Sequence, residues 1–193
     1  MRPVICVITD GRLRSVDDAA PWLARVAAAA QAGAHLIQVR ERTLDDRALS
    51  MIVRRCRDVV QGTRARVVVN DRLDVALACG ADGVHLKSDS YPVRRAREIT
   101  PRGFLVGRSV HSATEAAAAG QGADYLIFGT VFATASKPGR TPVGTTALAA
   151  AAVARAGAAG IAAIGVFTGP TADDVATSVD RIARAFDLAR SGS

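Results

Sequence analysis

Short apolar runs alternate with longer segments that repeat apolar residues at helical spacing along almost the whole chain. This alternation constrains the fold most, because βαβα order is typical of a parallel sheet covered by helices. The runs are apolar almost throughout, as expected of strands buried on both faces. We predict strands at Val4–Thr9, Leu36–Arg40, Arg66–Val69, Gly83–Leu86, Phe104–Ser109, Tyr125–Val131 and Ile161–Val166. We predict helices at Asp17–Ala32, Leu44–Val60, Asp71–Cys79, Val93–Ile99, Ala113–Gly120, Thr145–Ala156 and Ala172–Leu188.

An α/β barrel and a doubly wound sheet both fit this order of elements. The first strand is followed by Thr-Asp-Gly-Arg at residues 9–12, not by a Gly-x-Gly-x-x-Gly turn, which disfavours a dinucleotide-binding sheet. A complete barrel has about eight strands, whereas the pattern shows no strand between Val143 and Ala156. We expect one domain over residues 1–193, a TIM-type β/α barrel that lacks one β/α unit near its C-terminus. An incomplete barrel exposes strand edges, so we also expect a homo-oligomer.

The net charge of +7 is compatible with an anionic small ligand or simply with an arginine-rich, solvated surface. No dense basic run occurs and Trp22, Tyr91 and Tyr125 are isolated, so we expect no nucleic-acid partner. No stretch reaches the roughly 18 apolar residues of a membrane span, and we expect a cytoplasmic protein without a membrane partner. Cys6, Cys56 and Cys79 have no metal-ligand spacing, which predicts buried, reduced thiols.

Polar residues cluster where the predicted strands end, which is where parallel β/α proteins build their sites. Gln38, Arg40 and Arg42 alternate along the end of the second strand, so we expect them on one side of it. Guanidinium groups bind phosphate or carboxylate with paired hydrogen bonds. The alternative is a surface edge that forms ion pairs with nearby acidic side chains such as Asp45 or Asp46.

The ends of the next strands offer further candidates. Asn70 and Asp71 follow the third strand; they either cap a helix or contribute a ligand for Mg²⁺. His85 lies within an apolar run and is predicted to be a core histidine. Ser109 and His111 end the fifth strand, and His111 is the best candidate for a general acid or base, with packing or capping next to Ser112 as the alternative.

The segment after the sixth strand combines hydroxyl groups, a lysine and glycines. This composition is typical of a loop that closes over an anion, although a solvated loop has the same composition. The candidate ligands are Thr134, Ser136, Lys137 and Gly144.

These motifs resemble the thiamine-phosphate synthase and thiazole tautomerase superfamily over residues 4 to 144. The resemblance rests on six motifs: Gln38–Arg42, Val69–Leu77, Gly80–Leu86, Gly107–Ser112, Gly122–Gly129 and Val131–Gly139. It implies an eight-stranded β/α barrel with its site at the carboxyl ends of the strands. It also implies that Gln38, Arg40 and Asn70 bind a pyrimidine diphosphate, that Asp71 binds Mg²⁺ in a synthase, and that Thr134, Ser136 and Lys137 face the phosphate groups.

The chain departs from the synthase pattern at two positions, where Arg42 replaces a lysine and Ser90 replaces a second metal carboxylate. Gly107–Ser112 and Tyr125–Phe132 are closer to the tautomerase branch, which moves a proton and needs no metal. That branch has a histidine where this chain has Thr130. Residues 156–167 resemble the family's last strand, and Gly165 and Val166 begin its phosphate-binding turn. The family's preceding strand and much of the helix that follows it are missing from this chain.

We therefore expect a thiamine-biosynthesis enzyme of thiazole tautomerase type, with a phosphorylated small-molecule substrate, His111 and Thr130 as catalytic positions and no cofactor. The first alternative is a thiamine-phosphate synthase, which would use Mg²⁺. The second is a protein that binds a phosphorylated heterocycle without catalysis.

Overall fold

The computed structural model describes residues 3–120, 122–129 and 159–191. Within these residues, seven parallel strands form one sheet in the order β6-β5-β4-β3-β2-β1-β7. The strands are β1 (Val4–Ile8), β2 (Leu36–Val39), β3 (Arg66–Asn70), β4 (Gly83–Leu86), β5 (Leu105–Val110), β6 (Tyr125–Phe128) and β7 (Gly160–Ala163). The helices are α1 (Ala19–Gln31), α2 (Asp46–Val59), α3 (Leu73–Ala78), α4 (Val93–Ile99), α5 (Ala113–Gly120) and α7 (Ala172–Ser191).

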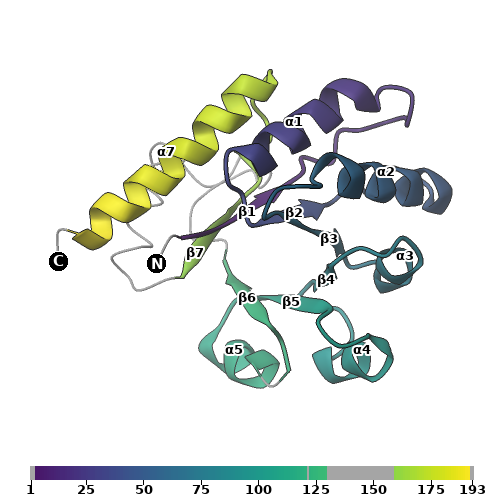
Figure 1. Cartoon of the computed structure of the whole chain (residues 1–193). Coiled ribbons are helices and arrows are strands. Elements are labelled where there is room, and N and C mark those ends of the chain that lie inside the picture. Colours follow the sequence, from purple (N-terminus) through teal and green to yellow (C-terminus); the bar gives the residue numbers. More distant parts are fainter. Residues whose placement is uncertain (1–2, 121, 130–158, 192–193) are drawn as a thin grey trace, which may run out of the picture.

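The sheet curls into a nearly closed barrel with the helices around its outside (Figure 1). Strand order follows the chain from β1 to β6, and β7 joins the free edge of β1 with Val4 opposite Gly160. A doubly wound sheet instead reverses its strand order at a switch point. The TIM-type barrel is therefore confirmed for the described residues. The predicted helix Thr145–Ala156 and the expected missing unit fall in 130–158, outside the described residues.

Alternation along each strand separates two apolar layers. One side of β1 to β3 faces the barrel interior, where Cys6, Leu36 and Val68 pack together. The other side faces the helices and forms the larger core, with fully buried residues such as Val7, Ile37 and Val67. Both faces of the strands are thus covered, which explains why the runs are apolar throughout.

Some predicted element boundaries were wrong by a few residues. Helix α3 begins at Leu73, not at Asp71, because Asp71 has a φ of 62° and cannot continue a right-handed helix. Helix α1 begins at Ala19, after a turn in which the Ala19 amide donates to the Val16 carbonyl. Strand β7 ends at Ala163, not at Val166, because the chain turns there and the Phe167 amide donates to the Ile164 carbonyl.

All three cysteines are free and buried, as predicted. Burial raises the pKa of Cys6 to about 12, so its thiol stays protonated and unreactive at neutral pH. No helix in the described part of the chain is long and apolar enough to cross a membrane.

Candidate functional site

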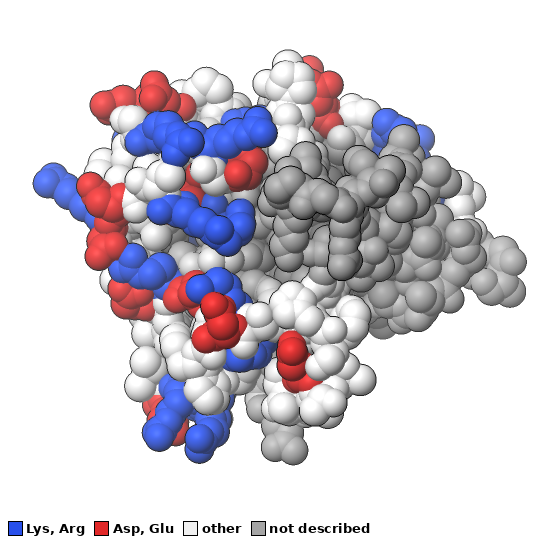
Figure 2. Space-filling view, turned by 180° about the vertical axis from the view of Figure 1, so that it is seen from behind, with Lys and Arg blue, Asp and Glu red and all other residues white. Residues whose placement is uncertain are grey.

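A cleft of about 540 Å³ opens at the carboxyl ends of β2, β3 and β4. Its walls carry four basic and three acidic side chains, together with one asparagine and three apolar residues. Figure 2 shows that charges of both signs are interleaved over one face of the molecule, without one continuous basic surface. A cleft of this size suits one small charged molecule. Its lining residues are Val39, Arg40, Glu41, Arg42, Leu44, Leu49, Asn70, Asp71, Arg72, Lys87 and Asp89.

Arg40 and Arg42 directly follow β2, and both line this cleft. The ion pairs of the described residues involve neither guanidinium, whereas Arg72 beside them is paired with Asp46 and Asp74 at 2.6 Å each. Burial and the neighbouring charge of Arg42 lower the pKa of Arg40, while Glu41 raises it. Two guanidinium groups without a carboxylate ion-pair partner in the described part of the chain favour an anionic ligand. The alternative of a salt-bridged edge is not supported there.

We expected side chains to alternate between the two sides of the strand over residues 38–42, but β2 ends at Val39. Glu41 also lines the cleft, and its carboxylate accepts hydrogen bonds from the Gly11 and Leu13 amides at 3.2 and 3.0 Å. These bonds tie the loop after β1 to the end of β2, and the Arg40 amide adds a bond to Thr9 Oγ1 at 2.8 Å. The position of Arg40 is therefore fixed through its own backbone.

Gln38 lies beneath the cleft, inside the barrel, with 2% of its surface exposed. Its Nε2 donates to Asn70 Oδ1 at 2.9 Å, which joins the ends of β2 and β3. Its Oε1 is buried and has no hydrogen-bond partner in the described residues. A buried acceptor without a partner costs free energy, so this oxygen favours a ligand or water that donates an N–H or O–H.

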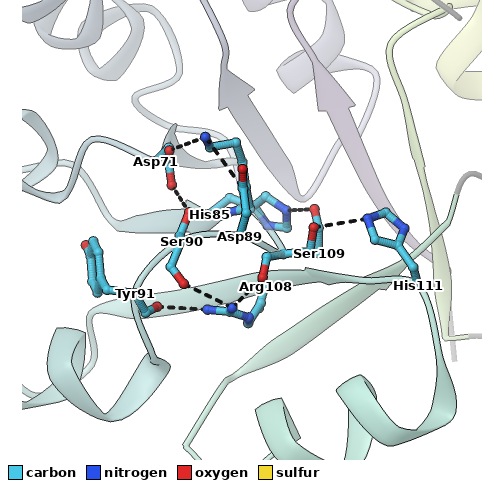
Figure 3. A network of polar contacts seen from close by, with 10 residues as sticks. Asp71, His85, Asp89, Ser90, Tyr91, Arg108, Ser109 and His111 are labelled. Carbon is cyan, nitrogen blue, oxygen red and sulfur yellow. Dashed lines mark hydrogen bonds and ion pairs between the residues drawn. The ribbon is translucent and has the colours of Figure 1, made fainter.

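Asp71 places its carboxylate between two groups of the loop after β4. Lys87 Nζ lies 2.9 Å from Oδ2, and the Ser90 hydroxyl donates to Oδ1 (Figure 3). Burial raises the pKa of Asp71, but the hydrogen bonds from Ser90 and Lys87 outweigh burial, so the pKa lies below its ordinary value. The left-handed backbone of Asp71 turns the chain sharply after β3, a conformation that aspartate tolerates better than most residues.

Asp71 and its neighbours Lys87 and Ser90 are not arranged to bind Mg²⁺. Mg²⁺ takes oxygen ligands, including one or two carboxylates, whereas each Asp71 oxygen already accepts from Lys87 or Ser90. Asp89 is exposed, and its carboxylate is 3.6 Å from the same Lys87 ammonium group. Across residues 3–120, 122–129 and 159–191, no three His, Cys, Asp or Glu side chains gather in a group that could hold a metal ion.

Arg108 holds the loop after β4 in place. Its guanidinium donates to the carbonyls of Ser88, Tyr91 and Ser90 at 2.7, 2.8 and 3.1 Å (Figure 3). One rigid loop therefore presents Lys87 and Ser90 to Asp71 on one side and Ser88 to His111 on the other.

His111 lies exposed after β5, outside the lining of the cleft. Its Nδ1 contacts the Gly129 carbonyl and its Nε2 lies 3.2 Å from Ser88 Oγ. A carbonyl only accepts, so Nδ1 carries the proton, and the Nε2 of a neutral ring accepts from Ser88. The capping role belongs to Ser112 and Glu115: Ser112 Oγ accepts from the Glu115 amide and Glu115 accepts from the His111 amide. In this tautomer the Nε2 lone pair of His111 points at the Ser88 hydroxyl.

His85 is buried and hydrogen-bonded, which confirms the prediction of a core histidine. Its Nε2 is 2.8 Å from Ser109 Oγ, its Nδ1 is 3.3 Å from the Tyr125 hydroxyl, and its ring stacks on Tyr125. Burial lowers the pKa of His85 to about 4, although Asp71 opposes this effect. The ring is therefore neutral near pH 7.

Acid should destabilise the fold through His85. The unfolded chain binds this proton near pH 6.5 and the folded chain only near pH 4, so stability falls as the pH drops through that window. Urea unfolding at pH 7 and pH 4.5 should show that His85→Gln loses about 2 kcal/mol less stability over this range than the wild type. An identical loss in both proteins would mean that His85 is not protonated on unfolding there.

The structure brings part of the predicted site together. Arg40, Arg42, Asn70 and Asp71 share the cleft, with Gln38 directly beneath it. Ser109 contacts His85 deeper in the barrel, and Gly165 lies in an exposed turn after β7; neither lines the cleft. The candidates outside the described residues are Thr130, Thr134, Ser136, Lys137 and Gly144.

Sequence reasoning gave no site role to Lys87, Asp89 or Glu41, all of which line the cleft. Lys87 has a usable signal, because it directly follows the carboxyl end of β4, where parallel β/α proteins build their sites. Glu41 gives no such signal, because its carboxylate binds the backbone amides of Gly11 and Leu13, which are distant in the sequence.

Comparison with known proteins gives a consistent result. The family described as "Thiamine monophosphate synthase" matches residues 5–185. The chain is 44% identical over 168 residues to the thiamine-phosphate synthase of Anaeromyxobacter dehalogenans, which covers 86% of this chain and 73% of that protein. It is 46% identical over 140 residues to the thiamine-phosphate synthase of Methanoculleus marisnigri, with 70% and 64% covered.

A solved structure supports the same family. "Thiamine phosphate pyrophosphorylase" from Pyrococcus furiosus superposes with a TM-score of 0.80 at 32% identity and covers 96% of both chains. Some curated relatives are longer than the matched region: the chain spans 33% of the thiamine-phosphate synthase of Gloeobacter violaceus and 65% of that of Methanoregula boonei.

Proposed function

Because the chain belongs to the thiamine monophosphate synthase family, which its residues 5–185 match, we propose that it joins a pyrimidine diphosphate to a thiazole phosphate, forming thiamine phosphate. The names of its relatives support the synthase reaction better than the tautomerase reaction. We assign the reaction to the cleft at the carboxyl ends of β2, β3 and β4.

The observation that carries this proposal is the pair Arg40 and Arg42. Among the described residues neither takes part in an ion pair, and both line a cleft of about 540 Å³. A diphosphate gains negative charge as its bond to the pyrimidine breaks. Guanidinium groups held next to the departing diphosphate stabilise that charge, and the fixed Arg40 backbone keeps one of them in place.

Gln38 and Asn70 suit the heterocycle. The Gln38 amide is held by its Nε2 bond to Asn70, and its Oε1 is left without a donor. An aminopyrimidine presents N–H groups that this oxygen accepts. The amide pair then orients the ring while the arginines hold the diphosphate, so the two parts of the substrate bind to adjacent strand ends.

The test supplies both substrates to the purified protein and follows thiamine phosphate by chromatography and released diphosphate by a coupled assay. We expect both products in equal amounts. Binding of the substrates without either product would favour the non-catalytic binding protein, and absence of binding would contradict the assignment of the cleft.

Thiazole tautomerisation is the second candidate, and the geometry of His111 favours it. The His111 Nε2 lone pair faces the Ser88 hydroxyl on an exposed loop, where a neutral imidazole can move a proton. Absorbance of the thiazole carboxylate phosphate tautomer should then change on aromatisation, and His111→Ala should slow this change by about 100-fold or more. An equal rate in buffer alone would exclude this candidate.

A further inference from the structure

The family resemblance assigns the Asp71 carboxylate to a metal ion. In this structure the ammonium group of Lys87 lies against that carboxylate instead. Asp71 is 26% exposed at its side chain, and both of its oxygens have donors within this chain. Lys87 Nζ contacts Oδ2 at 2.9 Å, while its distance to Asp89 is longer, at 3.6 Å. The ammonium group therefore lies nearer the half-buried carboxylate than the exposed one.

Ser90 completes this arrangement. Its hydroxyl accepts from the Lys87 amide at 3.0 Å and donates to Asp71 Oδ1. A carboxylate at position 90 would repel Asp71 and need a cation between the two groups, whereas a hydroxyl donates directly. Arg108 fixes the loop that carries both residues, so the pairing does not depend on a flexible segment.

The positive charge of the cleft that no ion pair of the described residues neutralises lies on Arg40 and Arg42. Lys87 neutralises Asp71, whereas Arg40 and Arg42 have no carboxylate partner among the described residues. A divalent cation approaching Asp71 would have to displace the Lys87 ammonium group and approach these two guanidinium groups. Each of these steps opposes metal binding.

We propose that Lys87 occupies the place of a divalent cation at Asp71, so that this cleft binds the phosphoryl groups of its ligand without Mg²⁺. The inference rests on the proposed function for the identity of the ligand, but it concerns only how the anion is bound. The ligand class is a phosphate or diphosphate ester, held by Arg40 and Arg42 beside the Lys87–Asp71 pair.

Calorimetry with inorganic pyrophosphate in excess EDTA tests this proposal. The wild type should bind pyrophosphate under these conditions. Lys87→Gln should bind about ten-fold more weakly, because Asp71 is then an unpaired negative charge next to the anion. Arg94→Gln removes one positive charge from an exposed site on α4 outside the cleft and should bind like the wild type. Pyrophosphate binding that is lost in EDTA would overturn the proposal.

Asp71→Asn separates the two roles of this residue by the sign of its effect. If Lys87 replaces the metal, removing the Asp71 charge should tighten pyrophosphate binding in EDTA by a few-fold. If Asp71 holds a metal for the anion, the same variant should abolish binding in Mg²⁺ buffer. Weaker binding by Asp71→Asn in a folded protein would contradict the inference.

Electron paramagnetic resonance of Mn²⁺ gives an independent reading. The wild type should bind no Mn²⁺ at millimolar concentration, whereas the double variant Lys87→Gly, Ser90→Asp should bind it, because it leaves two carboxylates without the lysine. Tight Mn²⁺ binding by the wild type would overturn the proposal. Product formation that strictly needs Mg²⁺ would support the proposed function and contradict this inference. Pyrophosphate binding in EDTA without turnover would support this inference and contradict the proposed function.

Discussion

Arg40→Ala should reduce kcat/KM for the pyrimidine diphosphate by about 10- to 100-fold, the loss expected for one charged hydrogen-bonding group. Arg40 is half-buried, its amide is fixed by Thr9, and its guanidinium lines the cleft without an ion pair among the described residues. Its removal leaves Arg42, which is more exposed, so residual activity should remain. Steady-state kinetics with the diphosphate as the varied substrate measure the effect.

Arg94→Ala is the matched control, since it also removes one arginine but lies exposed on α4 outside the cleft. It should leave kcat/KM unchanged. An equal loss in both variants would show that net charge, rather than contact with the ligand, determines activity. An unchanged kcat/KM for Arg40→Ala would contradict the proposal that the diphosphate binds in this cleft.

Phe167→Ala should lower the free energy of unfolding by about 3 to 5 kcal/mol, the usual cost of removing a buried phenyl ring. Phe167 has no exposed surface and packs edge-to-face against Trp22, with ring centres 5.4 Å apart. The Arg25 guanidinium lies over the same ring and donates to the Phe167 carbonyl at 3.1 Å. These contacts attach the turn after β7 to α1, so the variant weakens the part of the barrel where β7 joins β1.

Phe128→Ala provides the comparison, because Phe128 at the end of β6 is 56% exposed. Its replacement should change the free energy of unfolding by less than about 1 kcal/mol. Urea unfolding of the three proteins measures both values. Equal stability of Phe167→Ala and the wild type would mean that the turn after β7 does not contribute to the cooperative core.

Much of the site could be predicted from strand ends alone. Arg40, Asn70 and Asp71 were expected together because parallel strands place their carboxyl ends at one rim, and the structure confirms this. The side chains of β2 were predicted only as far as the strand continues. Glu41 follows the strand, so the two-residue alternation no longer fixes where its carboxylate points.

The alternation of apolar runs and amphipathic segments by itself determined the seven strands, most of the helices and the rim that carries the site, because these depend on local periodicity and on burial of both sheet faces. The partner of Asp71 was decided only by the tertiary structure. Lys87 is 16 residues further along the chain, and its contact needs the β3–β4 pairing, the turn at Ser90 and the hold of Arg108 on the loop. A sequence pattern reports the face on which a residue lies, but the group that meets it across strands depends on loop conformations that no local periodicity contains.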